Sequence, residues 1–132
     1  MKLFLDTNIL IDLIDSERKE HADAVSLFSV AKANRIQLVT TADVIATGAY
    51  YVKNAEAFRK IMTKLNPLLT ILPITDKIID KVNKRVHPDY EDSMHIVCAE
   101  ENEISAILTR DKKHYEKYTH IPVLSGSDFL MA

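Results

Sequence analysis

The stretch KLFLDTNIL, residues 2–10, decides the fold of this chain. Its apolar run, Leu3 to Leu5, is typical of a buried strand in a parallel sheet. The run ends abruptly in Asp6, which two small polar residues follow. Ligands of open α/β sheets bind beyond the carboxyl ends of the strands, and a carboxylate near a core is costly unless it is paired or metal-bound. Asp6 is therefore a candidate site residue.

Two further segments place acids at the ends of predicted elements. The segment ISAILTRD, residues 104–111, is a second apolar run, and it ends in Asp111. The segment DYED, residues 89–92, begins an apolar-periodic helix, where the helix macrodipole favours negative charge. Taken singly, Asp92 also fits a plain helix N-terminal charge, and Asp111 a plain loop acid.

Together, the three acids predict one carboxylate-lined metal site. Mg²⁺ and Mn²⁺ prefer oxygen ligands in proteins. A cation held in this way can activate a water molecule and stabilise charge on a phosphodiester. We therefore expect Asp6, Asp92 and Asp111 to bind a divalent ion and to carry catalysis.

The composition indicates an ordinary globular protein. A chain of 132 residues can form one domain with its own core, and we expect a single domain over residues 1–132. The net charge of −2 gives no global sign of nucleic-acid binding, so only a local basic patch could argue for it. The single cysteine, Cys98, excludes an internal disulfide and fits a reducing compartment as a buried thiol. No apolar run approaches membrane length, so we expect a cytoplasmic protein with no membrane partner.

The apolar spacing predicts strands that alternate with helices. Strands are expected over 3–5, 36–39, 69–72, 104–108 and 121–124. Helices are expected over 8–14, 17–33 (capped by Ser16), 42–52 and 89–102, after the caps Asn54 and Thr75, and in a short segment near 112–117. The apolar stripe of the second helix is Ala24, Val25, Phe28 and Ala31. This alternation predicts a three-layer α/β/α fold around a mainly parallel sheet of about five strands.

One glycine stands out in this pattern. Gly48 lies in the middle of the helix predicted over 42–52, where glycine costs about 1 kcal/mol relative to alanine. We therefore expect either close packing or a bend at that position.

Three segments of the chain resemble PIN domains. They are LDTNILID (5–12), YEDS (90–93) and LTRDKK (108–113), and their order, spacing and total length are similar to those of the toxins of bacterial VapBC toxin–antitoxin pairs. The resemblance covers essentially the whole chain. It implies a Mg²⁺- or Mn²⁺-dependent endoribonuclease that acts on RNA, usually forms a homodimer and is inhibited by a small antitoxin protein.

The resemblance also implies roles for particular residues. Asp6, Asp92 and Asp111 match the first, third and fourth acids of the metal site of PIN domains. Asn8 and Thr109 would be polar neighbours that help to orient those ligands.

One position departs from the pattern of the family. PIN domains usually carry a glutamate on the helix after the second strand, but here that segment reads TADVIATGAYY (41–51), with Thr47 or Gly48 at the position. Asp43 lies about one turn earlier, where a capping or first-turn role is the simpler interpretation. Glu91 is the other candidate for the missing ligand. Because adjacent helical residues point about 100° apart, Glu91 and its neighbouring acid reach one ion only if the helix start is irregular or a water bridges them.

Basic residues near the proposed site are candidates for contact with RNA phosphate. Arg110, Lys112 and Lys113 adjoin the fourth acid, which motivates a phosphate role, for Arg110 in particular. A second basic group fits a solvated helix face better than an RNA track: Lys53, Arg59, Lys60 and Lys64.

Three other side chains have two interpretations each. His95 lies one turn from Asp92 and could be a general base or a partner of a ligand, although a partly buried histidine is the simpler interpretation. Tyr50 and Tyr51 could stack bases, but core or dimer packing is the simpler role on this apolar helix.

Two alternative functions remain open at this point. The first is a PIN-like domain whose weakened metal site serves only RNA binding or protein interaction, which the missing glutamate supports. The second is phosphoryl transfer through Asp6, as in haloacid-dehalogenase-type phosphatases, which also have an acid after the first strand. Those enzymes require a second aspartate two residues after the first, where this chain has Asn8.

Overall fold

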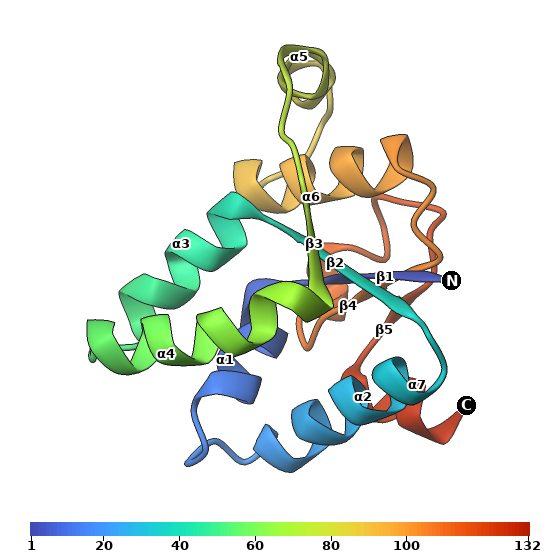
Figure 1. The fold of residues 1–132 in the computed structure, drawn as a ribbon. Coiled ribbons are helices and arrows are strands. Elements are labelled where there is room, and N and C mark those ends of the chain that lie inside the picture. Colours follow the sequence, from blue (N-terminus) through green and yellow to red (C-terminus); the bar gives the residue numbers. More distant parts are fainter.

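A five-stranded sheet forms the centre of the computed structural model, which describes all 132 residues (Figure 1). Its strands are all parallel and run in the order β3-β2-β1-β4-β5. Their bounds are β1 (Lys2–Leu5), β2 (Gln37–Thr41), β3 (Leu69–Leu72), β4 (Ala106–Leu108) and β5 (Val123–Leu124). The predicted parallel sheet of about five strands is confirmed.

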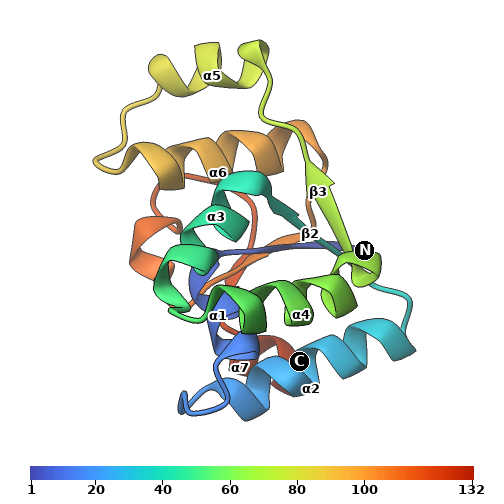
Figure 2. The same ribbon diagram turned by 60° about the vertical axis from the view of Figure 1, so that its left-hand side comes forward.

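Seven helices cover the sheet and complete the three-layer α/β/α fold. They are α1 (Thr7–Ile14), α2 (His21–Ala33), α3 (Ala42–Tyr51), α4 (Ala55–Leu65), α5 (Asp76–Asn83), α6 (Tyr90–Glu101) and α7 (Gly126–Met131). Figures 1 and 2 show α2 and α7 on one side of the sheet, and α6 on the other with α5 outside it. Helices α1, α3 and α4 lie toward the end to which β1 points (Figure 1). All the helices are too short or too polar to span a lipid bilayer.

The side chains of β1 alternate between two hydrophobic cores. Phe4 belongs to the larger core, with residues of α3, α5 and α6. Leu3 and Leu5 belong to the second core, with residues of α1 and α2. Because successive strand residues point to opposite faces, a central strand in this position has to be apolar throughout. This is why the continuous run after Lys2 correctly predicted a buried parallel strand.

The pairing of β1 with β4 brings two distant segments together at one edge. Leu5 pairs with Leu108, and the backbone N–H of Asp6 donates to the carbonyl oxygen of Leu108 at 3.0 Å. The next residue of each chain segment, Asp6 and Thr109, therefore leaves the sheet at the same place. Parallel pairing thus positions the first and last parts of the predicted site beside each other.

Three of the predicted helix starts are confirmed by their caps. Asn54 accepts from the backbone N–H of Ala57, and Thr75 from that of Ile78. Asp89 accepts in the same way from the backbone N–H of Asp92, so α6 begins at Tyr90. Each cap satisfies one of the free N–H groups of a first helical turn.

The start and the buried face of α2 differ from the prediction. The helix begins at His21 rather than at residue 17, and Ser16 does not cap it. Residues 15–20 form turns instead, in which Asp15 accepts from the backbone N–H of Glu17. The buried face also contains a different residue, because Val25 is exposed and Leu27 is buried.

One helix was not predicted: α7 follows the last strand, capped by reciprocal bonds between Ser125 and Asp128. Of the two packing roles expected for Tyr50 and Tyr51, packing in the core is wrong, since 82% and 61% of their surfaces are exposed and their rings contact each other edge to face. Packing in a dimer stays a prediction. Cys98 is fully buried, as expected.

Gly48 packs closely in α3 but leaves room for a methyl group. A Cβ at this position would lie 3.6 Å from Cδ2 of Leu10 and 3.7 Å from Cε1 of Phe58, which are ordinary van der Waals distances. Glycine therefore gives no packing advantage that alanine would lose.

We expect Gly48→Ala to stabilise the protein by about 0.5–1 kcal/mol, because alanine has less backbone freedom to lose on folding. For a domain of this size the melting temperature should rise by about 2–5 °C. Thermal unfolding followed by circular dichroism measures the change. A lower melting temperature would mean that the contacts with Leu10 and Phe58 are tighter than they are in the structure.

Candidate metal centre

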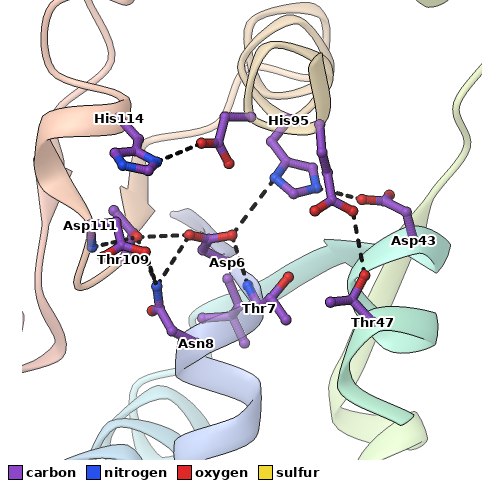
Figure 3. Close-up of polar contacts among 12 residues, drawn as sticks. Asp6, Thr7, Asn8, Asp43, Thr47, His95, Thr109, Asp111 and His114 are labelled. Atoms are coloured by element: carbon purple, nitrogen blue, oxygen red, sulfur yellow. Dashed lines mark hydrogen bonds and ion pairs between the residues drawn. The ribbon is translucent and has the colours of Figure 1, made fainter. Parts of the chain in front are cut away.

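An open, polar cleft lies at the carboxyl ends of β1 and β4. It is lined by acids from three parts of the chain and by two arginines, among them Asp6, Glu91, Asp92, Asp111, Arg18 and Arg110. The three acids at predicted element ends therefore face one cleft, as the sequence led us to expect. Figure 3 shows how the polar side chains around Asp6 converge from β1, β4 and the helices.

Asp6 forms the floor of this cleft. Only 6% of its surface is exposed, and burial raises the pKa of its carboxyl against the opposing effects of His95, Thr109 and Thr7. Thr7 donates its backbone N–H to Oδ1 at 2.8 Å, and the Thr109 hydroxyl donates to Oδ2 at 2.8 Å. The amide of Asn8 donates to Oδ2 at 3.4 Å (Figure 3). The carboxylate is thus held firmly, although its charge is poorly solvated.

Asp92 reaches the cleft from the first turn of α6. The Tyr115 hydroxyl donates to its Oδ1 at 3.0 Å, and Nδ1 of His114 lies 2.9 Å from its Oδ2. Ligand atoms of Asp6, Asp92 and His95 all lie within 4.8 Å of one another. Carboxylates this close repel each other unless a cation or proton lies between them.

Asp111 lies at the rim of the cleft. Its side chain is exposed, and its Oδ2 accepts from the amide of Asn8 at 3.2 Å. The same amide lies 3.3 Å from the Thr109 hydroxyl oxygen and also donates to Asp6. Asn8 therefore links the acids that follow β1 and β4, but Asp111 does not belong to the tight cluster around Asp6 and Asp92.

His95 and Asp43 form a contact beside the cleft that the sequence did not reveal. His95 is fully buried, and its Nε2 lies 2.5 Å from Oδ2 of Asp43. Its Nδ1 lies 3.1 Å from the Tyr115 hydroxyl and 3.7 Å from Oδ1 of Asp6. Burial opposes ionisation of Asp43, but the hydrogen bond and charge of His95 outweigh it and lower the pKa of Asp43 to about 2.

This contact changes the interpretation of both residues. Burial alone would lower the pKa of His95, but its hydrogen bond to Asp43 and the nearby carboxylates raise it. Asp43 lies in the first turn of α3, yet it accepts no backbone N–H and the N-cap is Thr41. His95 is therefore the nearest group to the buried acids that becomes positive on protonation, and Asp43 fixes its ring.

Residues 2–113 match the family model described as PIN domain. The chain belongs to the PIN domain family. The match covers β1 through the acid after β4, so it includes every acid of the cleft. Membership of this family also sets aside the phosphatase alternative.

Known relatives of this PIN domain include curated and solved proteins. "Ribonuclease VapC1" of Aquifex aeolicus (strain VF5) is 29% identical over 136 residues, which cover 97% of this chain and 92% of the relative. A structure of VapBC-1 from nontypeable Haemophilus influenzae matches with a TM-score of 0.69 and 18% identity over 96% of this chain and 99% of that chain. VapC20 of Mycobacterium tuberculosis, a sarcin-ricin loop cleaving toxin, matches with a TM-score of 0.60 and 12% identity over 80% and 86%. The two structural matches show a shared fold.

Glu91, in the first turn of α6, reaches the neighbouring helix α3. The hydroxyl of Thr47, on α3, donates to Oε2 of Glu91 at 3.5 Å (Figure 3). Glu91 also has a ligand atom within 4.8 Å of those of Asp43 and His95. Burial and the neighbouring Asp43 carboxylate raise the pKa of Glu91 to about 7. A carboxylate from α6 thus lies beside Thr47, one of the two positions of α3 at which the family pattern predicts a glutamate.

Arg110 lines the cleft, but its guanidinium is already bound. It donates from Nε and Nη2 to Asp12 at 2.9 and 3.1 Å. Asp12 is buried and also accepts from Nη1 of Arg18 at 3.2 Å, a partner that the sequence did not suggest. Of the two lysines proposed to contact phosphate beside Arg110, Lys112 forms an ion pair with Asp128.

The donors around the cleft fit a hard divalent cation. They are carboxylate oxygens, and at least one of them is buried with a raised pKa, which is the state of an acid that lacks enough positive charge nearby. Mg²⁺ and Mn²⁺ both take oxygen ligands. Asp6, Asp92 and Glu91 present such oxygens to one cleft.

Glu91 predicts how the stability of the metal-free protein depends on pH. Its folded-state pKa of about 7 lies above the ordinary 4.5, so the folded protein holds a proton that the unfolded chain has lost. Its contribution to stability is present below about pH 4.5 and is lost as the pH rises through about 7. We expect the melting temperature in EDTA to fall over this range, and Glu91→Gln to show a smaller fall.

The matched control is Glu116→Gln, because the Glu116 side chain is exposed and makes no side-chain hydrogen bond or ion pair. Its melting temperature should follow that of the parent at each pH. Equal pH profiles for Glu91→Gln and the parent would show that Glu91 keeps an ordinary pKa. The pKa of Asp6 is also raised, so the melting temperature of Glu91→Gln should still fall somewhat as the pH rises.

Proposed function

We propose that this PIN domain is a Mg²⁺- or Mn²⁺-dependent endoribonuclease, the toxin of a VapBC-type toxin–antitoxin pair. The observation that carries the proposal is the convergence of Asp6 and Asp92, 86 positions apart in the sequence (92 − 6), within 4.8 Å at the edge of a parallel sheet. The near full-length similarity to a curated ribonuclease supports it. All residues, 1–132, form one catalytic domain in this proposal.

The proposed ligand set consists of acids that face the cleft. Asp6 and Asp92 would hold the ion, and Glu91 would supply the oxygen that the family glutamate otherwise provides. Asp111, at the rim, completes the acidic set. Asn8 and Thr109 orient the ligands, because both donate hydrogen bonds to Asp6.

When bound, the ion supplies an activated water and stabilises the charge that develops on the phosphodiester. The side chains of this protein prepare the site for that chemistry. Asn8 holds the Asp6 and Asp111 carboxylates through one amide, so neither turns away from the cleft. Arg110 and Arg18 line the same cleft, and the N–H groups that they do not donate to Asp12 are the donors nearest to an RNA phosphate there.

One observation favours a second candidate function, a non-catalytic RNA-binding or interaction module. Thr47 or Gly48 stands where the family usually has glutamate, which weakens the metal site if nothing replaces that oxygen. The contact between Thr47 and Glu91 argues for replacement, because it brings a carboxylate to the same place. Metal-dependent cleavage of RNA by the pure protein distinguishes the two candidates.

Asp92→Asn is the test of the nuclease proposal. Asparagine keeps the size and one acceptor of the side chain but removes its charge, so the fold should survive. We expect cleavage of a generic RNA in Mn²⁺ or Mg²⁺ to fall by at least about 100-fold, since the ion is held less well. Initial rates on a fluorescent RNA measure the effect.

The matched control is Asp80→Asn, on the outer helix α5. Asp80 pairs only with Lys84, and both side chains are largely exposed, so activity should not change. Equal cleavage by Asp92→Asn and the parent would remove Asp92 from the site. Absence of metal-dependent cleavage by the parent would favour the non-catalytic module.

We also propose that a small antitoxin binds this protein and that the protein forms a homodimer. The solved neighbours from Haemophilus influenzae and Rickettsia felis are named VapBC-1 and VapBC2, the latter bound to a promoter DNA fragment. Purification of the tagged chain from its own operon should recover a second small protein in stoichiometric amount, with a mass in solution above that of one chain. A monomer of 15.0 kDa without a companion would contradict both proposals.

A further inference from the structure

Four side chains form a continuous hydrogen-bonded chain behind the metal centre. Asp43 of α3 contacts Nε2 of His95, on α6, at 2.5 Å. Nδ1 of His95 lies 3.1 Å from the hydroxyl of Tyr115, which follows the short 3-10 turn Lys112–His114. The same hydroxyl lies 3.0 Å from Oδ1 of Asp92. The chain thus joins α3, α6 and the loop after β4, and it ends on a proposed metal ligand.

The donors and acceptors fix the direction in which each hydrogen bond of this series is donated. A carboxylate only accepts, so the Tyr115 hydroxyl donates its proton to Asp92. The hydroxyl oxygen then accepts from Nδ1–H of His95, and Nε2–H donates to Asp43. Every polar atom of the two central residues is therefore used within the chain.

The central residues are packed so that they have little freedom to move. His95 and Tyr115 are both fully buried, and the His95 ring also lies against Phe4, with 5.2 Å between the ring centroids. A group held in a close-packed core keeps its rotamer. Asp92, by contrast, lies in the first turn of α6, where the only other side-chain donor to it is the exposed His114.

The distances argue against His95 as a direct metal ligand. Nδ1 is the ring nitrogen nearer to Asp6, but it lies closer to the Tyr115 hydroxyl, at 3.1 Å, than to Oδ1 of Asp6, at 3.7 Å. A nitrogen that donates a proton has no lone pair for a metal. Mg²⁺ and Mn²⁺ also favour oxygen over imidazole.

We propose that Tyr115, held by His95 and Asp43, is a positioning residue that fixes the Asp92 carboxylate for metal binding. The inference rests on the proposed metal-dependent function. The Tyr115 hydroxyl occupies one lone pair of Oδ1 and leaves the others directed elsewhere, so Asp92 meets the ion without first losing side-chain freedom. Asp43 thereby acts on the site through two intermediates and is neither a helix cap nor a ligand.

Tyr115→Phe tests the proposal, because it removes the hydroxyl and keeps the buried ring. We expect Mn²⁺ to bind about 10- to 100-fold more weakly, the usual effect of losing a hydrogen-bond partner of a ligand. Electron paramagnetic resonance of free Mn²⁺ measures the affinity without reference to activity. Cleavage by Tyr115→Phe should recover at saturating Mn²⁺, because the ligand itself is still present, whereas Asp92→Asn should not recover.

The matched control is Tyr118→Phe, on the same loop, whose hydroxyl makes no hydrogen bond to another protein group. Its Mn²⁺ affinity should equal that of the parent. Thermal unfolding in EDTA checks that Tyr115→Phe is folded. If it does not fold, Asp43→Asn at the other end of the chain replaces it, with weaker Mn²⁺ binding expected and unchanged affinity counting against the proposal.

Two results would overturn the positioning role. One is an unchanged Mn²⁺ affinity in folded Tyr115→Phe when the parent binds Mn²⁺ and cleaves RNA, which would leave the proposed function intact. The other is a ¹⁴N coupling to bound Mn²⁺ in pulsed resonance spectra of the parent that disappears in His95→Gln, which would make His95 a ligand. A parent that neither binds Mn²⁺ nor cleaves RNA would overturn the proposed function together with this inference.

Discussion

Asp6 carries a carboxylate at the carboxyl end of the central strand, where only 6% of its surface reaches solvent. Burying a charge in this way is unfavourable unless donors or opposite charges replace the lost water. The backbone of Thr7, the hydroxyl of Thr109 and the amide of Asn8 supply three donors. His95 is the nearest group that becomes positive on protonation, with Nδ1 3.7 Å from Oδ1 of Asp6. Much of the polar structure at this edge of the sheet can be understood as support for this one acid.

The support is assembled from parts of the chain that are far apart in sequence. Parallel pairing of β1 with β4 places Thr109 opposite the end of β1, and Asn8 then connects both strand ends to Asp111. On the other side, α6 presents Asp92 and His95 from one helical face, since they lie three residues apart. The site therefore depends on the register of one strand pair and on the position of one helix, and the two large cores determine both.

The sequence predicted those features that depend on local pattern. The apolar run before Asp6 indicated a buried parallel strand, and Asn54 and Thr75 marked helix starts, because caps and periodicity are written within a few residues. The acids at strand ends predicted the cleft, since parallel strands end at one edge. The turn at 15–20 and α7 were missed, although the pair Ser125 and Asp128 has the spacing of a capping box and could have indicated α7. The contact between Asp43 and His95 could not be predicted, because it depends on how α3 packs near α6 across 52 residues of sequence.

Glu91 reaches from α6 to Thr47 on α3, so a carboxylate lies against the helix on which the sequence lacks the expected glutamate. A column-by-column comparison of sequences records only that α3 has no glutamate at Thr47 or Gly48. A comparison made in space also records the carboxylate that α6 brings to the same helix. A PIN domain should therefore be classified by where the carboxylate oxygens of its metal site lie, and not by which helix carries them. Relatives with the pair of acids at 91 and 92 should be sorted by that criterion.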